Sequence, residues 1–559
     1  MDATGAASEF ASASDSFTGV TAALGSPGIA GFIATIPWAG QQFATTRELA
    51  GIGSDVAAAG TDLTKVLRDA ASSGDASGTP HGIASLLGPN HERLTGALSS
   101  LLSAADRASR IATAGLLPPL ARAVDSLQSA LGEYAPVLDR ARGMLPLLRY
   151  VGTERRILVV SQDGAELRPT GGFAGSFGII NVGPSGVSLE AYRDVYALPN
   201  PPGVVTPPPG ALITKDLEFR DANWWLDFPT SAREMLKLWG AAGQAHFDGI
   251  VAIDTVMMED LLETTGPVRV QKFHQTFTAA NLLDRLLYLV EIKHVGKGVI
   301  EALAQQLEQR VLDSDPSEMA KSADALKAAA DSKHLQVYLT DAAAQAGVET
   351  LGWSGRVAMA KGGTDLLAVC NAMNRAGKAN AGMHKSAAYN VALRADRSAD
   401  TTLTLRFAAT APFPLALPGV FRDWLRVYRA PGTAFTASPS GAALATATEF
   451  GLPAEVRTFT LLRGQSRALT LLARVPGAIA AEPNGTALRY RLRVVRQADL
   501  EEIPTTITVS APAGWKVASA SARFTGPGTP QPVTVDGGRV SLSVGLWGDL
   551  ELDVRLIQP

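Results

Sequence analysis

The period of the hydrophobic residues changes twice along this chain, and that change restricts its fold more than any other feature. Between about residues 41 and 150, apolar residues recur every three or four positions, as in Leu94, Leu98 and Leu101, which is the period of an amphipathic helix. Short continuous apolar runs then replace this pattern, and from about Tyr389 strand-like runs alternate with Gly, Pro and Asp turns. A chain of 559 residues with three such regions is predicted to be a multidomain α+β protein.

Together with residues 1–40, which precede them, these three regions give four predicted segments. The first is rich in Ala, Ser, Gly and Thr and is expected to be weakly ordered. The second is expected to hold two or three antiparallel helices, with breaks at Gly88-Pro89-Asn90 and Leu117-Pro118-Pro119, where proline removes a helix donor. The predicted boundaries are 1–40 for the weakly ordered segment, 41–150 for the helical stalk, 151–388 for an α/β domain with a helical insertion at about 278–333, and 389–559 for one or two β-sandwich modules.

Strands and helices alternate in the α/β segment. Ile157–Val160 and Gly249–Ile253 are short apolar runs typical of buried strands. A helix is predicted from Val256 to Thr264, and Leu335–Leu339 is predicted to be a strand that returns to the sheet. This alternation favours a sheet covered by helices.

Composition and common motifs exclude several classes of function. The formal net charge of -3 argues against a general nucleic-acid-binding protein, which would need a basic surface. No stretch reaches the roughly 18 to 20 apolar residues of a membrane-spanning helix. The sequence has no P-loop, HExxH, GxSxG, paired CxxC or EF-hand pattern. The single cysteine, Cys370, lies in an apolar run and is predicted to be a core thiol.

The most informative segment for function is the glycine-rich sequence ELRPTGGFAGS, which begins at Glu166. Arg168 offers a planar donor fork suited to phosphate or carboxylate. Gly171 and Gly172, after Thr170, let the backbone approach a ligand closely. The alternative is a bulged hairpin in which the Glu-Arg pair satisfies its own backbone.

Charged residues in three later loops are candidates for the same pocket. Asp227 precedes a predicted helix and Asp254 ends a predicted strand, so each could bind a ligand or cap the next helix. Arginines and carboxylates from separate loops suit a phosphorylated ligand with Mg²⁺. The predicted ligand-binding residues are Glu166, Arg168, Thr170, Gly171, Gly172, Arg193, Arg220, Asn223 and Asp254, and the predicted catalytic and metal-binding residues are Asp194 and Asp227.

Three of these segments resemble a bacterial family, domain of unknown function 4012. The matching stretches are Asp163–Phe173, Asp221–Trp224 with Asp227–Pro229, and Phe247–Val268, and the tail is also similar, so the resemblance covers roughly 41–559. Members of that family usually carry one N-terminal transmembrane helix, with the remainder outside the cell. The resemblance therefore implies an extracytoplasmic, membrane-anchored protein whose anchor would precede Met1.

The central part is also distantly similar to the LytR-CpsA-Psr family, which transfers glycopolymers from a polyprenyl pyrophosphate carrier onto peptidoglycan. By order along the chain, Arg168-Pro169-Thr170, Arg193-Asp194 and Asn223 resemble the segments that surround the pyrophosphate in that family. The match departs from the family pattern at two places. The Asp of its Arg-x-Asp-Thr strand is missing, and around Thr278 to Tyr288 only Arg285 stands where a later arginine signature would fall.

Three functions follow from these resemblances and residues. The first is a phosphotransferase in which arginines bind a polyprenyl pyrophosphate and Asp194 or Asp227 holds Mg²⁺ or activates the acceptor hydroxyl. The second is a non-catalytic envelope scaffold or glycan-binding protein. The third is a glycosidase with Glu166 and one of the two aspartates as acid and base. The expected partners are a lipid-linked glycan or cell-wall polymer, the membrane, and a second copy through the stalk helices.

Overall fold

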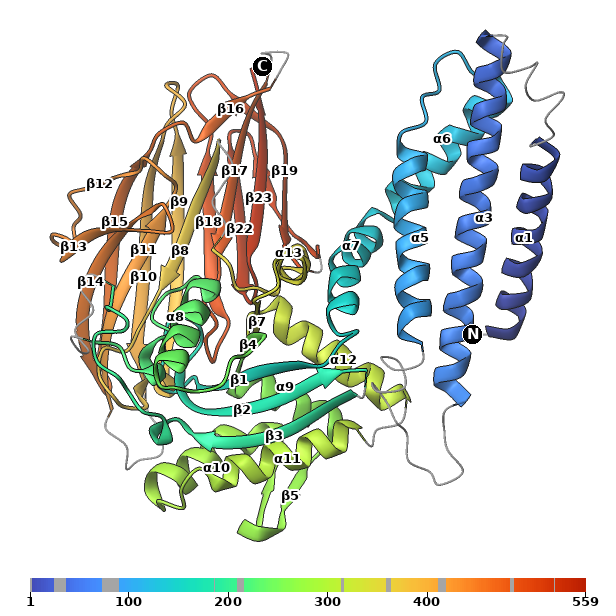
Figure 1. The fold of residues 1–559 in the computed structure, drawn as a ribbon. Coiled ribbons are helices and arrows are strands. Elements are labelled where there is room, and N and C mark those ends of the chain that lie inside the picture. Colours follow the sequence, from blue (N-terminus) through green and yellow to red (C-terminus); the bar gives the residue numbers. More distant parts are fainter. Residues whose placement is uncertain are drawn as a thin grey trace.

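The structure is a mixed α/β protein with helices at its N-terminus and a large β-rich region at its C-terminus. Figure 1 shows this computed structural model, in which the first helices stand beside a central layer of strands and helices, and long strands form the far side. The structure describes residues 3–24, 37–72, 90–184, 186–208, 216–312, 316–357, 363–410, 419–482, 487–526 and 528–558.

The described part of the N-terminal region contains five helices. Pro118 and Pro119 lie in the first turn of α6, where their missing N–H groups cost nothing, so the predicted break there is a helix start. Gly88 and Pro89 of the other predicted break lie outside the described residues. None of the described helices is both long and apolar enough to cross a membrane. The helices are α1 (Ala3–Leu24), α3 (Pro37–Ser72), α5 (His91–Ser109), α6 (Pro118–Glu133) and α7 (Ala135–Tyr150).

Helix α1 differs from the weak order that the composition of residues 1–40 predicts. Its alanine-rich sequence favours a helix, and its two phenylalanines pack on α3. A Cβ atom added at Gly53 or Gly60 of α3 would lie 2.7 Å from the ring of Phe17 or Phe10. The small residues of α3 therefore form the surface that receives these rings, a role that composition alone does not reveal.

The central sheet has five strands in the order β3-β2-β1-β4-β7. Strands β1 and β4 are parallel, and the other neighbours are antiparallel. Both Ile157 and Leu158 of β1 are buried, on opposite faces, as a continuous apolar run predicts. The strands are β1 (Arg155–Asp163), β2 (Phe173–Gly183), β3 (Gly186–Asp194), β4 (Gly249–Asp254) and β7 (Leu335–Leu339).

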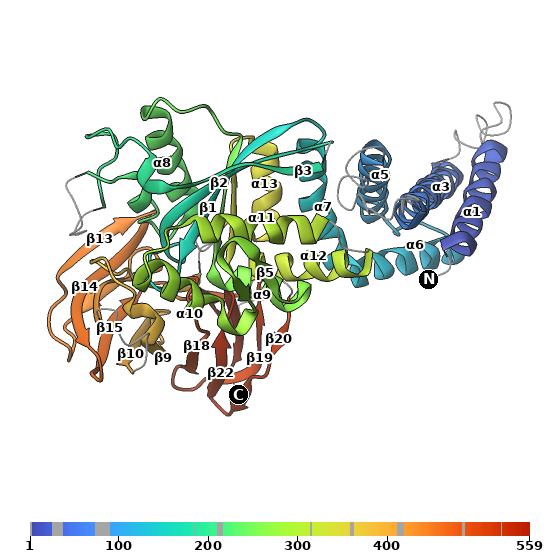
Figure 2. The same cartoon turned by 90° about the horizontal axis from the view of Figure 1, so that it is seen from below.

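Helices cover the sheet on two sides. Helix α8 packs on the face that carries Leu158 and Val160, and the helices that follow β4 gather on the opposite side (Figure 2). Helices α10 to α12 occupy the predicted insertion. The elements are α8 (Phe228–Ala241), α9 (Thr255–Thr265), the hairpin β5 (Val268–Val270) and β6 (Gln275–Phe277), α10 (Leu282–Leu287), α11 (Gly298–Leu312), α12 (Pro316–Asp331) and α13 (Ala342–Leu351).

Two large sheets share one buried core in the C-terminal region. The first is β12 (Ala434–Thr436), β15 (Ser466–Val475), β10 (Ala399–Ala409), β9 (Met383–Leu393), β18 (Ile503–Ser510), β22 (Arg539–Leu546) and β21 (Thr534–Asp536), in that order. The second is β13 (Ala445–Glu449), β14 (Leu452–Leu462), β11 (Val420–Arg429), β8 (Thr364–Cys370), β17 (Ala487–Val495), β23 (Leu550–Ile557), β19 (Lys516–Phe524) and β20 (Pro530–Gln531), with β16 (Ile479–Ala481) paired to β17.

The β region begins earlier than residue 389, because β8 and the start of β9 belong to its sheets. Strand β8 pairs in parallel with β17, so that Thr364 lies opposite Arg491. Such a long-range pairing leaves no local signal in the sequence. Cys370 at the end of β8 is fully buried, and burial raises the pKa of its thiol to about 12, as a core cysteine predicts.

Candidate functional site

A deep cavity of about 1110 Å³ lies between the central sheet and helices α9 to α12. Its floor is the face of the sheet opposite α8, and its walls are the apolar sides of these helices. This volume is slightly above the usual range of ligand pockets, roughly 300–1,000 Å³. The apolar lining includes Val159, Ile180, Leu189, Met258, Leu261, Leu283, Leu286, Val290, Ile300, Leu303, Ala304, Leu307 and Val311.

Charged side chains gather in one part of the cavity lining, which we call the polar end. They come from the end of β1 and the β1–β2 loop, the short 3₁₀ helix Phe219–Asp221, the helical segment Tyr288–Ile292, the residue before α11, and the loop after β8, which also contributes the uncharged Asn374. Ion pairs connect most of them to one another. The polar end comprises Asp163, Glu166, Arg168, Arg220, Asp221, Glu291, Lys297, Asn374, Arg375 and Lys378.

Arg168 lies at the polar end but is enclosed by the protein. Its guanidinium donates to Glu166 Oε1 at 3.0 Å, to Asp221 Oδ1 at 3.4 Å and to the Met373 carbonyl at 2.8 Å. It also lies over the ring of Trp224, 5.1 Å from the ring centroid, and only 3% of the residue is exposed. The predicted anion-binding arginine is therefore also a structural anchor of its loop.

Lys378 is a charged residue of this site that the sequence did not indicate. Its ammonium lies 3.0 Å from Asp163 Oδ2, 3.1 Å from Glu166 Oε2 and 3.5 Å from Glu291 Oε1. Burial alone would lower the pKa of Lys378, but the three carboxylates raise it above its usual value. Glu166 is thus held between two cations, which makes it a poor candidate for a catalytic acid or base.

Arg220 and Lys297 both lie over the ring of Tyr196. Their cationic groups lie 4.9 and 5.0 Å from the centroid of its ring, and 61% of Tyr196 is exposed. Lys297 also contacts the Gly175 carbonyl and donates to Asp194 Oδ1 at 3.1 Å. This part of the polar end is therefore open to solvent and carries two cations near each other.

Of the two predicted catalytic aspartates, Asp194 lies beside the cavity and Asp227 does not. Asp194 accepts from Lys297 and from the Tyr196 backbone N–H. Asp227 caps α8 through the Thr230 N–H and hydroxyl, and it also accepts from the Val357 N–H at 2.9 Å. The cap of α8 therefore accounts for Asp227, which does not line the cavity, and only Asp194 lies near it.

Other predicted binding residues shape the loop without lining the cavity. The Asn223 side chain donates to Gln162 Oε1, Thr170 Oγ1 and the Gly172 carbonyl, at 2.7–2.9 Å. A Cβ atom on Gly172 would lie 2.4 Å from the Asp163 backbone, so only glycine fits this close approach. These residues hold the β1–β2 loop in shape.

Gly171 and Arg193 are two further predicted ligand-binding residues that do not line the cavity. Gly171 has a φ of 127°, a conformation that glycine adopts readily, and neither residue lines the cavity. Arg193 is exposed on β3, because the alternation along the strand directs it away from the floor. The sequence predicts a ligand contact for each of these residues. In the structure Gly171 has a backbone role and Arg193 faces solvent.

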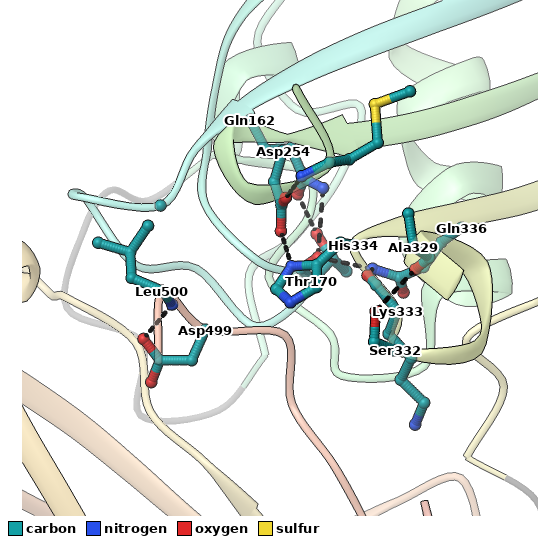
Figure 3. Close-up of polar contacts among 12 residues, drawn as sticks. Gln162, Thr170, Asp254, Ala329, Ser332, Lys333, His334, Gln336, Asp499 and Leu500 are labelled. Atoms are coloured by element: carbon teal, nitrogen blue, oxygen red, sulfur yellow. Dashed lines mark hydrogen bonds and ion pairs between the residues drawn. The ribbon is translucent and has the colours of Figure 1, made fainter. Parts of the chain in front are cut away.

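Asp254 is at the cavity wall, where it caps α9 and contacts a histidine that the sequence did not single out. Figure 3 shows its carboxylate beside His334, with Asp254 Oδ2 2.6 Å from His334 Nδ1. Arg496 Nη2 lies 3.1 Å from His334 Nε2. Because an arginine only donates, Nε2 accepts from Arg496, and Nδ1 is the ring nitrogen that faces Asp254. This group joins the sheet to the C-terminal region.

No described group of three or more His, Cys, Asp or Glu residues is arranged to hold a metal ion. Mg²⁺ needs few protein ligands when substrate phosphates supply the others. Asp194 is the only one of the two proposed metal ligands that lies near the polar end. Of the two predicted alternatives, Asp227 is used by the cap of α8, and Asp194 stays the predicted Mg²⁺ ligand near the cavity.

The sequence of this site matches a known protein family. Residues 153–290 match the family described as "Protein of unknown function (DUF4012)". The resemblance to DUF4012 is confirmed over this segment. It contains β1 to β4, α8 to α10 and five charged residues of the polar end, whereas Glu291, Lys297, Asn374, Arg375 and Lys378 follow it. The description of the family assigns no activity.

Other comparisons add little. No curated protein matches the chain. The M1 zinc metallopeptidase of Deinococcus radiodurans is 16% identical over 31% of this chain, with a TM-score of 0.17. A point variant of that enzyme with a Tyr-Ser-Ala substrate is 15% identical over the same share, with a TM-score of 0.18. The chain covers 42% of each of these structures, and neither fold nor activity is inferred from them.

Proposed function

We propose that the central domain binds a polyprenyl phosphate or pyrophosphate that carries a glycan, outside the cell. The single observation that supports this most strongly is one cavity with a long apolar body and a charged end. Each buried methylene contributes roughly 0.8 kcal/mol, so the apolar body suits a prenyl chain. The polar end suits the phosphate to which that chain is joined.

Arg220 and Lys297 are the proposed phosphate-binding cations. Arg220 is half-buried and Lys297 is near the exposed Tyr196, so both are within reach of a ligand that enters from solvent. Arg168 and Lys378 are surrounded by carboxylates and backbone carbonyls, and their proposed role is to hold the loops in place.

Binding without transfer is the function that this geometry supports best, as in a scaffold or carrier of lipid-linked glycan. Transfer to a cell-wall acceptor is a second candidate, favoured by the position of Asp194 beside Lys297. In that case Asp194 would take the proton of the acceptor hydroxyl, whose oxygen would bond to the glycan-bearing phosphorus of a pyrophosphate carrier, and the polyprenyl phosphate would leave with its charge neutralised by Lys297 and Arg220. A glycosidase is not proposed, because Glu166 is enclosed by Arg168 and Lys378.

The test is binding of a polyprenyl phosphate in detergent to the wild type and to two variants of α11. Ala304 lines the cavity and Gln305, the next residue, is exposed. Ala304→Phe should fill the apolar body and weaken binding at least tenfold, whereas Gln305→Phe should bind as the wild type does. Equal binding by both variants, or no binding by a folded wild type, would overturn the proposal.

A further inference from the structure

The loop between β8 and β9 brings Asn374 and Arg375, together with residues 376–378, to the cavity. Asn374 and Arg375 line its polar end, although both lie outside the segment that matches the family. Neither was indicated by the sequence. They add to the cavity a polar surface that the central domain does not supply.

The backbone of this loop is held firmly. The Met373 N–H donates to the Leu167 carbonyl at 2.9 Å, and the Asn374 N–H donates to the Arg422 carbonyl at 2.9 Å. Arg168 in turn donates to the Met373 carbonyl at 2.8 Å. Met373 is therefore fixed against the β1–β2 loop and Asn374 against β11, so a ligand at this place would meet a preorganised surface.

The Asn374 side chain is buried without a partner. Only 8% of the residue is exposed, and neither Nδ2 nor Oδ1 has a hydrogen-bond partner among the described residues. Buried amides are nearly always paired. The amide nitrogen Nδ2 offers two donors, and the oxygen Oδ1 is an acceptor. A hydroxyl group both donates and accepts, so it can pair with either atom.

Arg375 has cationic capacity that the other charged residues of the polar end lack. Arg168, Arg220, Lys297 and Lys378 each form an ion pair with a carboxylate. Arg375 is exposed and has no ion pair or hydrogen bond within the part of the chain that the structure describes. Its five donors suit hydroxyl, ring or acidic oxygens of a ligand.

We infer that Asn374 and Arg375 form a saccharide subsite, which receives the sugar attached to the phosphate of the lipid carrier. This inference rests on the proposed function, because it requires the prenyl chain in the apolar body and the phosphate near Arg220 and Lys297. The sugar then meets the β8–β9 loop, and the C-terminal region confers preference for the glycan-bearing carrier over the bare lipid phosphate.

The test compares two ligands in detergent, a polyprenyl phosphate and a polyprenyl phosphate that carries one sugar. The wild type should bind the sugar-bearing lipid at least tenfold more tightly. In Asn374→Leu and Arg375→Ala this ratio should fall towards one, because the lost contacts are made only by the sugar. Arg406→Ala, a change at an exposed arginine of β10, is the matched control and should keep the ratio.

The outcomes separate this inference from the proposed function. Binding of both lipids with equal affinity by the wild type, or a ratio that survives in both variants, would overturn the saccharide subsite and leave the lipid site standing. Failure of the folded wild type to bind either lipid would overturn both. Asn374→Asp, which keeps the size and acceptor but removes the donors, serves where Asn374→Leu does not fold.

Discussion

Arg168 and Arg375 both line the cavity, yet the protein holds their side chains in opposite ways. Arg168 is buried between Glu166 and Asp221, and Arg375 is exposed. Loss of Arg168 would leave two buried carboxylates short of a cation, which is strongly destabilising, about 3–5 kcal/mol for a typical buried pair. A loss of binding in an Arg168 variant would therefore not identify a ligand contact, whereas substitutions of exposed or half-buried cations would.

Asp227 gives a test at the scale of one residue. Asp227→Ala removes the cap of α8 and leaves the buried Val357 N–H unpaired. We expect the free energy of unfolding to fall by about 1–3 kcal/mol, measured by urea denaturation, with lipid binding retained. Asp341→Ala, which removes the similar cap of α13, is the control. Normal stability together with lost binding would restore a direct role for Asp227.

Helix α9 forms part of the cavity wall, and it also makes the stability of the protein depend on pH. It begins at the Asp254 cap and its apolar side forms part of the cavity wall. Glu259 lies in the middle of this helix and is half-buried. Burial, with Asp254 and Asp260 nearby, raises the pKa of Glu259 from 4.5 to about 7.

This raised pKa predicts a change in stability with a definite sign. A carboxyl whose pKa is higher in the folded state stabilises the fold below its unfolded pKa, and that stabilisation is lost as the pH rises through about 7. Glu259→Gln should thus be more stable than the wild type above pH 7, by about 1–2 kcal/mol after allowance for its partial exposure. Urea denaturation at several pH values measures this difference.

The control for this prediction is Glu263→Gln, at an exposed position of the same helix. Its effect on stability should be small and similar at all pH values. A constant difference between Glu259→Gln and the wild type from pH 5 to pH 8 would contradict the assigned burial of the Glu259 carboxyl.

At the scale of the whole molecule, the C-terminal region completes the cavity of the central domain. Gln497 donates to the Arg168 carbonyl, and the Asn380 N–H donates to the Ala165 carbonyl. One buried core also runs from α8 through Trp224 to Trp424 of β11. The glycine-rich loop is therefore held between two parts of the chain, and its shape depends on both.

Local patterns in the sequence predicted the elements better than the site. The apolar run Ile157–Val160 and the alternation that follows it correctly placed β1, β4 and α9, because burial on both faces of a sheet is a local property. Arg168 and Arg220 line one cavity, and their ligand contacts stay predictions. The side-chain and backbone chemistry of Arg193, Asp227 and the two glycines suggests ligand binding. Their roles depend instead on strand alternation for Arg193, on a helix cap for Asp227 and on close backbone packing for the glycines.

The missed residues were beyond the reach of local reasoning. Lys378 meets Glu166 across 212 positions of the chain, and Gln497 meets Arg168 across 329. His334, Asn374 and Lys378 stand in no motif. The contacts of Asn374 and Lys378 with the β1–β2 loop side of the cavity, and that of Arg496 with His334, arise only when the sandwich packs on the central sheet. Contacts of this kind are fixed by topology, which a single sequence does not display.

We propose that a prenyl chain occupies the apolar body of the cavity. Photo-crosslinking can locate that chain on the protein. A polyprenyl phosphate with a photoreactive group on its chain would be activated on the folded protein, and the labelled peptides identified by mass spectrometry. A prenyl chain in the apolar body should place labels on α9, α10 and α11, and Ala304→Phe should reduce this labelling. Labels confined to the N-terminal helices or to the β-sandwich would contradict it.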